Sequence, residues 1–336
     1  MSPSPQSFVF VVPDPGTTVS GGHLYNTGLI RALRLAGAAV ETIDGETFAE
    51  RARGGVAGRY LVDTLYLAVL RDLPLGDIDV HLVVHHLESL FPPQGQSSDE
   101  VFAESEEPVL RALSGFIATS EFTEFYLVGR GFDPDTIVVV PPAVEGFDGE
   151  VAAHEDPGLS VLVVANLVAR KQVLVLLQAL KDVGDFGGTV RIVGGSELEP
   201  EYAQACREIV ESHPNLQRSI TFVGTLPHDA MPAEYARADV LVSAARMETF
   251  GMALQEAVAS GTPVFAVDAG FVASHVVEGV TGRVFRSAEE MARGILELAE
   301  DRPTLERLTE ASREARPQGE CSWSSSARRL LEAFRA

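Results

Sequence analysis

Cysteine is almost absent from this chain, which has only Cys206 and Cys321 in 336 residues. Two thiols cannot build the disulfide framework of a small secreted domain, so we expect a reducing, cytoplasmic compartment. Long apolar runs are missing as well. No stretch approaches the roughly 18 apolar residues of a membrane-spanning helix, and the run Phe8–Val12 is too short for a signal peptide. The sequence therefore predicts a cytoplasmic protein without a transmembrane segment.

Positive charge is also scarce. The chain has 26 Lys and Arg against 48 Asp and Glu, a formal net charge of −22. Such a balance disfavours nucleic acid or an anionic membrane surface as a partner, because both would be repelled at long range. Lysine is rarer still, since Lys171 and Lys181 are the only two. An anionic substrate would therefore need a local basic pocket.

Apolar runs that alternate with helical patterns are abundant. In the first half, strands are predicted at Phe8–Val12, Val40–Ile43, Asp79–Val84, Gly115–Ser120 and Ile137–Val140, and the segment Gly58–Leu70 is predicted to hold a further short strand and a helix. The pattern restarts at residue 160, with predicted strands over 160–167, 189–195, 220–224 and from 240 onward. Continuously apolar strands that alternate with helices specify parallel, doubly wound sheets. We predict an α/β fold with two Rossmann-like domains, 1–150 and 151–318, joined by a Pro- and Gly-rich linker over 141–158.

Two features of the first half lie where a ligand would bind. Gly21 and Gly22 follow the first strand at the start of a helix, where a backbone without Cβ can approach a phosphate or a sugar; a flexible turn is the alternative. His85 and His86 follow another strand at the carboxyl edge of the sheet, and at most one of them should face a cleft. A core or capping histidine is equally compatible, and metal binding is not expected because no third ligand has suitable spacing.

The acidic run 99–107 is predicted to be a solvated loop and helix start.

Arg170 and Lys171 precede the predicted helix 173–183. Cations at the positive end of a helix dipole oppose helix stability, and an anionic ligand would remove the conflict. Lys171 also uses lysine against the bias of the chain. We therefore predict a phosphate-binding role for this pair; the alternative is a solvated surface pair.

The stretch from Val240 to Ala269 reads as a strand, a loop that ends at Glu248, and a helix that is entered at Gly251 and carries Glu256. Unpaired N–H groups at a helix start attract phosphate, whereas carboxylates accept hydrogen bonds from hydroxyl groups. Phosphate donors beside hydroxyl acceptors indicate a nucleotide-sugar site. The sequence has no G-x-G-x-x-G fingerprint, so nicotinamide binding is not supported.

Several segments in order, NLVARK, RIVGG, ITFVGTL and EYARADVLVSAARMETFGMALQEAVASGTPV, resemble glycosyltransferase family 4, the retaining enzymes of the GT-B fold. The turn SGG, the segment GFIATSEFTEFYLVGRG and the C-terminal SWSSSARRLLEAF extend the resemblance over nearly the whole chain. It implies a first domain on the acceptor side, a second domain that binds the donor, and a C-terminal helix within 319–336 that packs back on the first domain.

The resemblance also implies roles for individual residues. Glu256 would accept the ribose hydroxyls, Glu248 would contact the transferred sugar, and Arg170 with Lys171 would neutralise the donor diphosphate. His85, or else His86, would contact the donor sugar from the first domain. The remaining donor-binding positions would be Thr249, Phe250, Gly251, Met252, Gly21, Gly22, Gly194, Thr225 and Leu226.

The implied activity is transfer of a hexose from a UDP- or GDP-sugar to a hydroxyl of a small-molecule, glycan or lipid-linked acceptor. Retention is expected, with no metal or further cofactor. A sugar-nucleotide epimerase and a non-catalytic nucleotide-sugar binding protein are the alternatives. One departure concerns the loop after the last core strand, where Phe271 replaces a second glycine and no carboxylate follows until Glu278. Sugar contacts from that loop are therefore doubtful.

Overall fold

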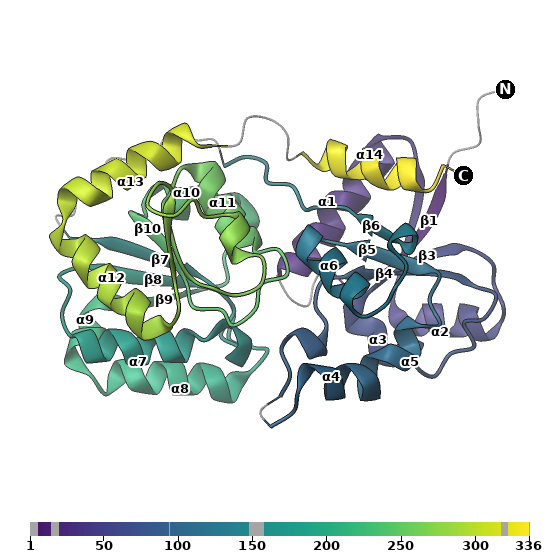
Figure 1. Cartoon of the computed structure of the whole chain (residues 1–336), viewed down its shortest axis with the longest axis horizontal. Coiled ribbons are helices and arrows are strands. Elements are labelled where there is room, and N and C mark those ends of the chain that lie inside the picture. Colours follow the sequence, from purple (N-terminus) through teal and green to yellow (C-terminus); the bar gives the residue numbers. More distant parts are fainter. Residues whose placement is uncertain (1–5, 15–19, 94, 148–157, 317–321, 336) are drawn as a thin grey trace. The chain divides into compact units, whose positions relative to one another are not determined.

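The computed structural model describes residues 6–14, 20–93, 95–147, 158–316 and 322–335 (Figure 1). The chain divides into two compact units. The first comprises Met1–Ala143 with Glu320–Ala336, and the second comprises Val144–Gly319. The boundary predicted near residue 150 lies outside the described residues. Among those residues, no helix is both long enough and apolar enough to cross a bilayer.

The first unit contains a six-stranded parallel sheet of order β2-β1-β3-β4-β5-β6. Its strands are β1 (Ser7–Val11), β2 (Ala39–Ile43), β3 (Arg59–Asp63), β4 (Asp79–Val84), β5 (Gly115–Ala118) and β6 (Ile137–Val139). The inner strands β1, β3, β4 and β5 are mostly buried, as parallel strands covered on both faces require, whereas the edge strand β2 is largely exposed.

Helix α14 (Trp323–Ala333) belongs to the first unit although it ends the chain. It packs on α1 (Gly21–Leu35), and both helices share an apolar cluster with the inner strands. Ser326 Oγ donates to Pro141 O at 2.7 Å, which joins α14 to the chain after β6. The other α-helices of this unit are α2 (Gly45–Arg53), α3 (Leu67–Leu70), α4 (Ser98–Val101), α5 (Glu107–Leu110) and α6 (Glu121–Gly129).

The expectation that the acidic run 99–107 is solvated is wrong for Val101, Phe102 and Glu106, which are buried. Glu106 ends a π-helix over Phe102–Glu106 and is only 1% exposed. Its carboxylate accepts from Ser89 N at 3.0 Å and from the Ser89 hydroxyl. Burial raises the pKa of Glu106. Composition alone could not separate this carboxylate from its exposed neighbours, because its partner is seventeen residues away.

The second unit repeats the architecture with a parallel sheet of order β12-β11-β10-β7-β8-β9. Its strands are β7 (Ser160–Val164), β8 (Thr189–Val193), β9 (Ile220–Gly224), β10 (Val240–Ser243), β11 (Val264–Val267) and β12 (Gly282–Phe285). Its α-helices are α7 (Val173–Val183), α8 (Pro200–Glu211), α9 (Pro214–Ser219), α10 (Met231–Ala236), α11 (Met252–Ser260), α12 (Ala288–Glu300) and α13 (Arg302–Glu314).

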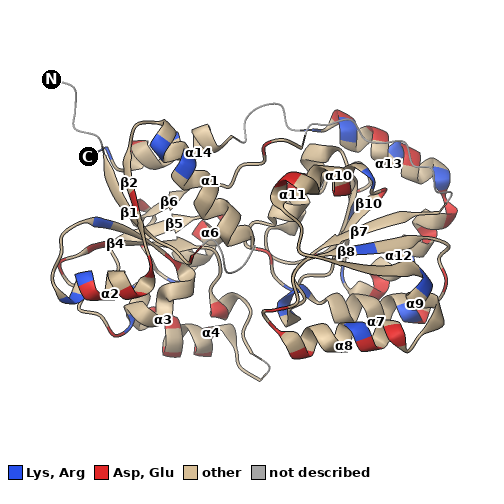
Figure 2. Ribbon diagram, turned by 180° about the vertical axis from the view of Figure 1, so that it is seen from behind, with Lys and Arg blue, Asp and Glu red and all other residues tan. Residues whose placement is uncertain are grey.

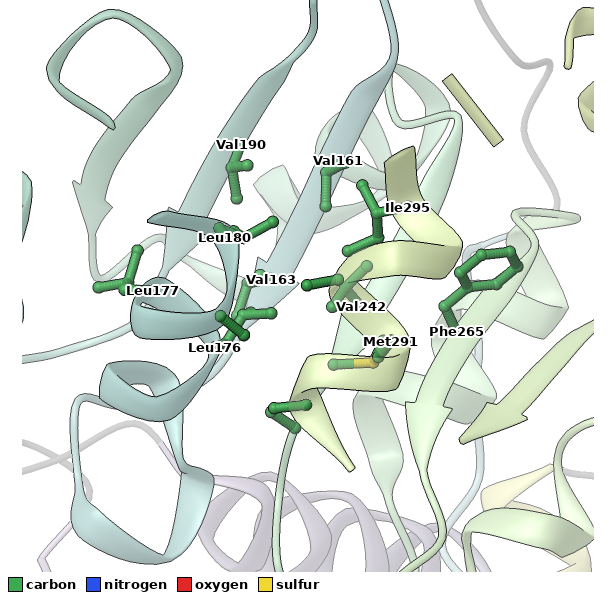
Figure 3. Close-up of a cluster of buried hydrophobic side chains, with 14 of the residues drawn as sticks. Val161, Val163, Leu176, Leu177, Leu180, Val190, Val242, Phe265, Met291 and Ile295 are labelled. Atoms are coloured by element: carbon green, nitrogen blue, oxygen red, sulfur yellow. The ribbon is translucent and has the colours of Figure 1, made fainter. Parts of the chain in front are cut away.

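Helices cover both faces of the second sheet. Alternate strand residues such as Val161 and Val163 meet the apolar stripes of α7 and α12, as the labelled side chains of Figure 3 show. Leu162 points to the opposite face, where it joins a cluster with α10 and α11. The outer helix α13 mixes both charge signs along its length (Figure 2), which is typical of a solvated face. The predicted pair of doubly wound parallel α/β sheets is thereby confirmed.

In each sheet the strand order reverses once. The reversal lies between β1 and β3 in the first unit and between β7 and β10 in the second. At such a switch point the loops after the two strands leave in opposite directions, so a crevice opens at their carboxyl ends and ligands bind there. The chain topology therefore directs attention to the loops after β1, β3, β7 and β10.

Candidate active site

In the second unit, the loops after β7 and β10 are tied together at the switch point. Arg246 N donates to Arg170 O at 3.0 Å, so the two loops share a main-chain bond. Beside it, the Lys171 ammonium donates to Glu248 Oε1 and forms an ion pair with it. The side chains of Lys171 and Glu248 are only 19% and 12% exposed. The fold thus brings together two residues that are 77 positions apart.

The charge balance of this cluster favours an anion. Burial lowers the pKa of Lys171, the Glu248 carboxylate raises it, and the nearby Arg170 guanidinium lowers it further. Within the described part of the chain, the Arg170 side chain has no hydrogen-bond or ion-pair partner. Two cations therefore stand beside one carboxylate, and a diphosphate would relieve their repulsion.

The turn that carries Arg170 and Lys171 is unusual in its backbone. Residues Ala169–Lys171 form a 3-10 turn that ends at Gln172, whose φ is +54°. Gln172 is the one non-glycine residue with positive φ among those described. Its side-chain amide donates to Ala169 O at 2.8 Å and so closes the turn. Gln172 is thus held in a strained backbone conformation by the bond of its own side chain. This fixes the position of the turn that carries Arg170 and Lys171.

Helix α11 starts next to Glu248 and has no side-chain cap in the described structure. Its N-cap is Gly251, with φ of +87°, and a Cβ there would lie 2.6 Å from Leu254 Cδ1. Glycine is therefore required at this position. The first turn contains no acidic residue, so the N–H groups from Met252 onward keep their positive potential for an anion.

The loop from Glu248 to Phe250 is braced by the segment that follows β11. Phe271 N donates to Glu248 O at 2.8 Å, and His275 Nε2 donates to Phe250 O at 2.5 Å. The rings of Phe250 and Phe271 stack at 5.9 Å. Burial lowers the pKa of His275. Phe271, noted above as a departure, thus supports the Glu248 loop through its backbone and its ring.

Glu278, the next carboxylate after Phe271, forms a hydrogen bond with a strand of the second sheet. Its Oε2 accepts from Val284 N on β12 at 2.8 Å. The sequence-based doubt about sugar contacts from this loop concerned the lack of a nearby carboxylate, and the structure gives Glu278 a structural partner instead.

Glu256 lies on α11 and is 4% exposed. Tyr235 OH donates to its Oε2 at 2.7 Å, and His228 Nε2 donates to its Oε1 at 3.2 Å. The bond to Glu256 raises the pKa of His228, and burial raises the pKa of Tyr235 well above its ordinary value. Sequence reasoning missed His228 and Tyr235, because they precede Glu256 by 28 and 21 positions without a motif.

Other predicted donor-binding residues lie at the carboxyl ends of β8 and β9. Gly194 packs so closely that a Cβ would be 2.0 Å from Ala165 O. At Gly195, a Cβ would meet Thr225 Oγ1 at 3.0 Å, and Gly195 N donates to Asn166 Oδ1 at 2.8 Å. Leu226 packs against the apolar cluster beneath α10 and α11. Gly194 and Thr225 therefore border the same edge as the loop after β7.

In the first unit, His85 and Gly22 are neighbours. Gly22 is the second residue of α1, and a Cβ there would lie 3.1 Å from His85 Cδ2. Ser20 caps this helix, with His23 N donating to its Oγ at 3.3 Å. The His85 ring bonds with Asn26 and lies 3.5 Å from the carboxylate of Asp63. Gly21 opens the helix, and His86 is half-buried beside His85.

The structure thus assembles the predicted residues in separate groups. Arg170, Lys171 and Glu248 meet at one switch point, with Thr249 in the same loop. Phe250, Gly251 and Met252 enter α11, and Glu256 follows one turn later. Among the described residues, no group of three His, Cys, Asp or Glu side chains has the geometry to hold a metal ion.

Residues 149–315 match the family model described as glycosyl transferases group 1. D-inositol 3-phosphate glycosyltransferase from Nocardia farcinica is 31% identical over 222 residues, which cover 61% of this chain and 49% of that protein. The enzyme of the same name from Segniliparus rotundus is 30% identical over 293 residues, 82% of this chain and 61% of that protein. The chain therefore spans about half to three-fifths of the length of these relatives.

Two solved structures have the same fold over nearly their whole length. Sucrose-phosphate synthase from Thermosynechococcus elongatus superposes with a TM-score of 0.79 at 21% identity, covering 98% of each chain. Anabaena HepE in complex with UDP and glucose gives a TM-score of 0.75 at 16% identity, covering 98% of this chain and 99% of the other. The fold is GT-B.

Proposed function

We propose that this chain, which carries a glycosyl transferases group 1 domain over residues 149–315 within a GT-B fold, is a retaining glycosyltransferase. It would move a hexose from a UDP- or GDP-sugar to a hydroxyl acceptor without a metal ion. The observation that carries the proposal is the cluster of Arg170, Lys171 and Glu248 beside the uncapped start of α11, at the switch point of the second sheet.

The proposed chemistry matches the charges of this cluster. When the bond between the anomeric carbon and the diphosphate oxygen breaks, negative charge builds on the leaving phosphate. Arg170, Lys171 and the N–H groups at the start of α11 would stabilise that charge, and each well-placed donor contributes about 3 kcal/mol. Thr249 to Met252 would line the phosphate through their backbone. Lys171 has three ammonium donors, so it can bind a phosphate oxygen and keep its bond to Glu248.

Glu256 is suited to bind the ribose. A carboxylate oxygen accepts two hydrogen bonds, and each oxygen of Glu256 receives one of the bonds described above, from Tyr235 or from His228. The carboxylate is thus held in place and still has one acceptor site on each oxygen for the two ribose hydroxyls. Gly194, Thr225 and Leu226 would border the nucleoside, the glycine through its backbone.

The first unit would contribute to the sugar and the acceptor. His85 would contact the donor sugar, and Gly21 with Gly22 would let the backbone at the start of α1 approach the ligand. In this assignment, residues 1–150 form the acceptor side, residues 151–318 the donor side, and the segment 319–336 completes the first domain. Acceptor attack on the face from which the phosphate leaves would retain the anomeric configuration.

The proposal is tested first by binding. Nucleoside diphosphates and their sugars are screened by thermal shift, since a ligand that binds the folded state at 100 times its Kd stabilises it by about 2.7 kcal/mol. We expect a rise in Tm with UDP or GDP. A screen in which none of these ligands raises the Tm would contradict the proposal.

The second test uses variants. Lys171→Ala and Glu256→Gln should each abolish the ligand-induced shift and most sugar transfer, whereas Lys181→Ala should retain both. Lys181 is the matched control, because it is the other lysine of the chain and lies at the far end of α7 beside Asp182. Near wild-type turnover in Lys171→Ala would overturn the assignment. Analysis of the products separates transfer from epimerisation, because an epimerase leaves the altered sugar on the nucleotide.

A further inference from the structure

Three polar side chains meet at the switch point of the first sheet. Asp63 is the last residue of β3, His85 follows β4, and Asn26 lies on α1 after the β1 loop. Asn26 Nδ2 donates to Asp63 Oδ2 at 2.6 Å, and His85 Nε2 lies 3.0 Å from Asn26 Oδ1. Asn26 and Asp63 are 3% and 2% exposed. Neither residue has a role in the function proposed above.

The direction of these bonds determines which nitrogen of His85 carries the proton. If the Asn26 amide were turned over, its oxygen would face the Asp63 carboxylate at 2.6 Å, and two acceptors would repel. The amide nitrogen must therefore face Asp63 and the amide oxygen must face His85. Because an amide oxygen only accepts, His85 Nε2 must donate.

The backbone of His85 is held as well. Its N–H donates to Thr64 Oγ1 at 2.9 Å, and the Thr64 hydroxyl donates to Val83 O at 2.5 Å. Asp63 is oriented in turn, because its Oδ1 accepts from Leu65 N at 2.8 Å. The residues in these bonds all belong to the first unit.

Two neighbours restrict the ring of His85. The Tyr25 ring meets it edge-on at 5.0 Å, and Gly22 leaves room for it. Burial lowers the pKa of His85, against the opposing effect of the Asp63 carboxylate, so the ring is neutral near pH 7. A neutral ring has a single N–H, and the contacts above assign it to Nε2.

We propose that Asn26 and Asp63 are positioning residues for His85, which they hold as the neutral tautomer protonated on Nε2. The inference rests on the proposed function, because the part of His85 in sugar transfer is itself proposed. The chemical reason for this arrangement is that burial of the Asp63 carboxylate is costly unless the carboxylate accepts hydrogen bonds. The bond from Asn26 to Asp63 orients the Asn26 amide, and the amide in turn orients the His85 ring, so that both bonds run in one direction. Such a pair of bonds keeps the ring from turning over, which is the preorganisation that transfer requires.

Asp63→Asn tests the direction of the two hydrogen bonds that join Asp63, Asn26 and His85. An amide at residue 63 can donate as well as accept, so the Asn26 amide is free to turn over and to donate to His85 Nε2, which moves the ring proton to Nδ1. The matched control is Asp79→Asn. Asp79 lies on the same sheet and pairs with His81 of β4 at 2.8 Å, but it does not contact His85.

The readout is the tautomer of His85 in the full-length protein, measured by long-range proton–nitrogen NMR correlation of labelled histidine. The chain has eight histidines, and the His85 signal is assigned by its loss in His85→Gln. We expect the wild type and Asp79→Asn to show the Nε2–H form and Asp63→Asn to show a mixture of both forms. A wild-type ring protonated on Nδ1 would overturn the inference without any variant having to fold.

Activity gives the second readout. In Asp63→Asn we expect kcat to fall on the order of 100-fold, the usual cost of a misplaced group. The Kd of the nucleoside diphosphate should change little, because its proposed diphosphate and ribose contacts, Arg170, Lys171 and Glu256, lie in the second unit. Asn26→Ala, which removes the acceptor of the Nε2 proton, should have the same effect on kcat. Unchanged kcat in a folded Asp63→Asn protein would refute the positioning role, whereas absence of nucleotide binding in the wild type would refute the proposed function and leave the tautomer result standing.

Discussion

Gly270 offers a sharp test of the Glu248 loop. Its φ is +63°, and a Cβ there would lie 2.3 Å from Glu248 O and 2.6 Å from Met247 Sδ. Gly279, in the same segment after β11, has a φ of +72° but no atom within 4 Å of the position of its Cβ. Alanine at either position meets the same backbone strain. Only Gly270→Ala pushes on Glu248.

The expected magnitudes follow from this comparison. The left-handed conformation costs an alanine roughly 1–2 kcal/mol at either position. At residue 270 the new methyl group must also gain about 1 Å of room before it reaches ordinary contact with the Glu248 carbonyl, which adds about 1–3 kcal/mol of overpacking. The bond from Phe271 N to Glu248 O, 2.8 Å long, is the first to be disturbed. A displacement of this size at a reacting group costs on the order of 100-fold in rate.

The assay compares both variants with the wild type. Urea unfolding followed by circular dichroism gives the free energy of unfolding, and nucleoside diphosphate release from the donor found by the ligand screen gives kcat. Gly279→Ala should lose stability and keep its turnover, whereas Gly270→Ala should lose more stability and most of its turnover. Equal stability and equal turnover in the two variants would show that Glu248 does not depend on this brace, and the reasoning about the loop would fail.

Two further predictions concern other parts of the two units. The bond to Glu256 raises the pKa of His228 above 6.5. The contribution of this bond to the free energy of unfolding is therefore fully present below pH 6.5 and is lost as pH rises through the raised pKa. In urea titrations across that pH window, His228→Gln should lack this pH dependence, and a variant with the pH profile of the wild type would contradict the prediction. Gly28 on α1 leaves no room for a Cβ, which would lie 2.2 Å from the ring of Trp323, so Gly28→Ala should displace α14, cost about 1–3 kcal/mol and red-shift the emission of the chain's single tryptophan. Gly129→Ala, at the end of α6 with nothing within 4 Å, is its control and should leave the spectrum unchanged.

Much of the fold could be predicted because several inner strands of the two sheets contain short, continuous apolar runs, which are visible in the sequence. The segments Phe8–Val12 and Ser160–Leu167 both contain central strands of their sheets. Strand β12 (Gly282–Phe285) was not predicted, because its sequence GRVF has no apolar run and its burial comes from pairing with β11. The burial of Glu106 was not predicted for a similar reason, because it depends on a hydrogen-bond partner that is distant in the sequence.

The residues of the candidate site also differ in whether the sequence around them carries a signal. Lys171, Glu248 and Glu256 could be proposed from the sequence, because a scarce lysine before a helix and two carboxylates on either side of a helix start are local signals. Asn26 and Asp63 carry no such signal, since their contact depends on β3 lying next to β1, and that strand order is not written in either segment. The one clue was positional: a carboxylate that ends a buried strand, as Asp63 ends β3, lies at the sheet edge where ligands bind. Polar residues at the carboxyl ends of strands are therefore worth testing even without a motif, because topology alone can bring them together.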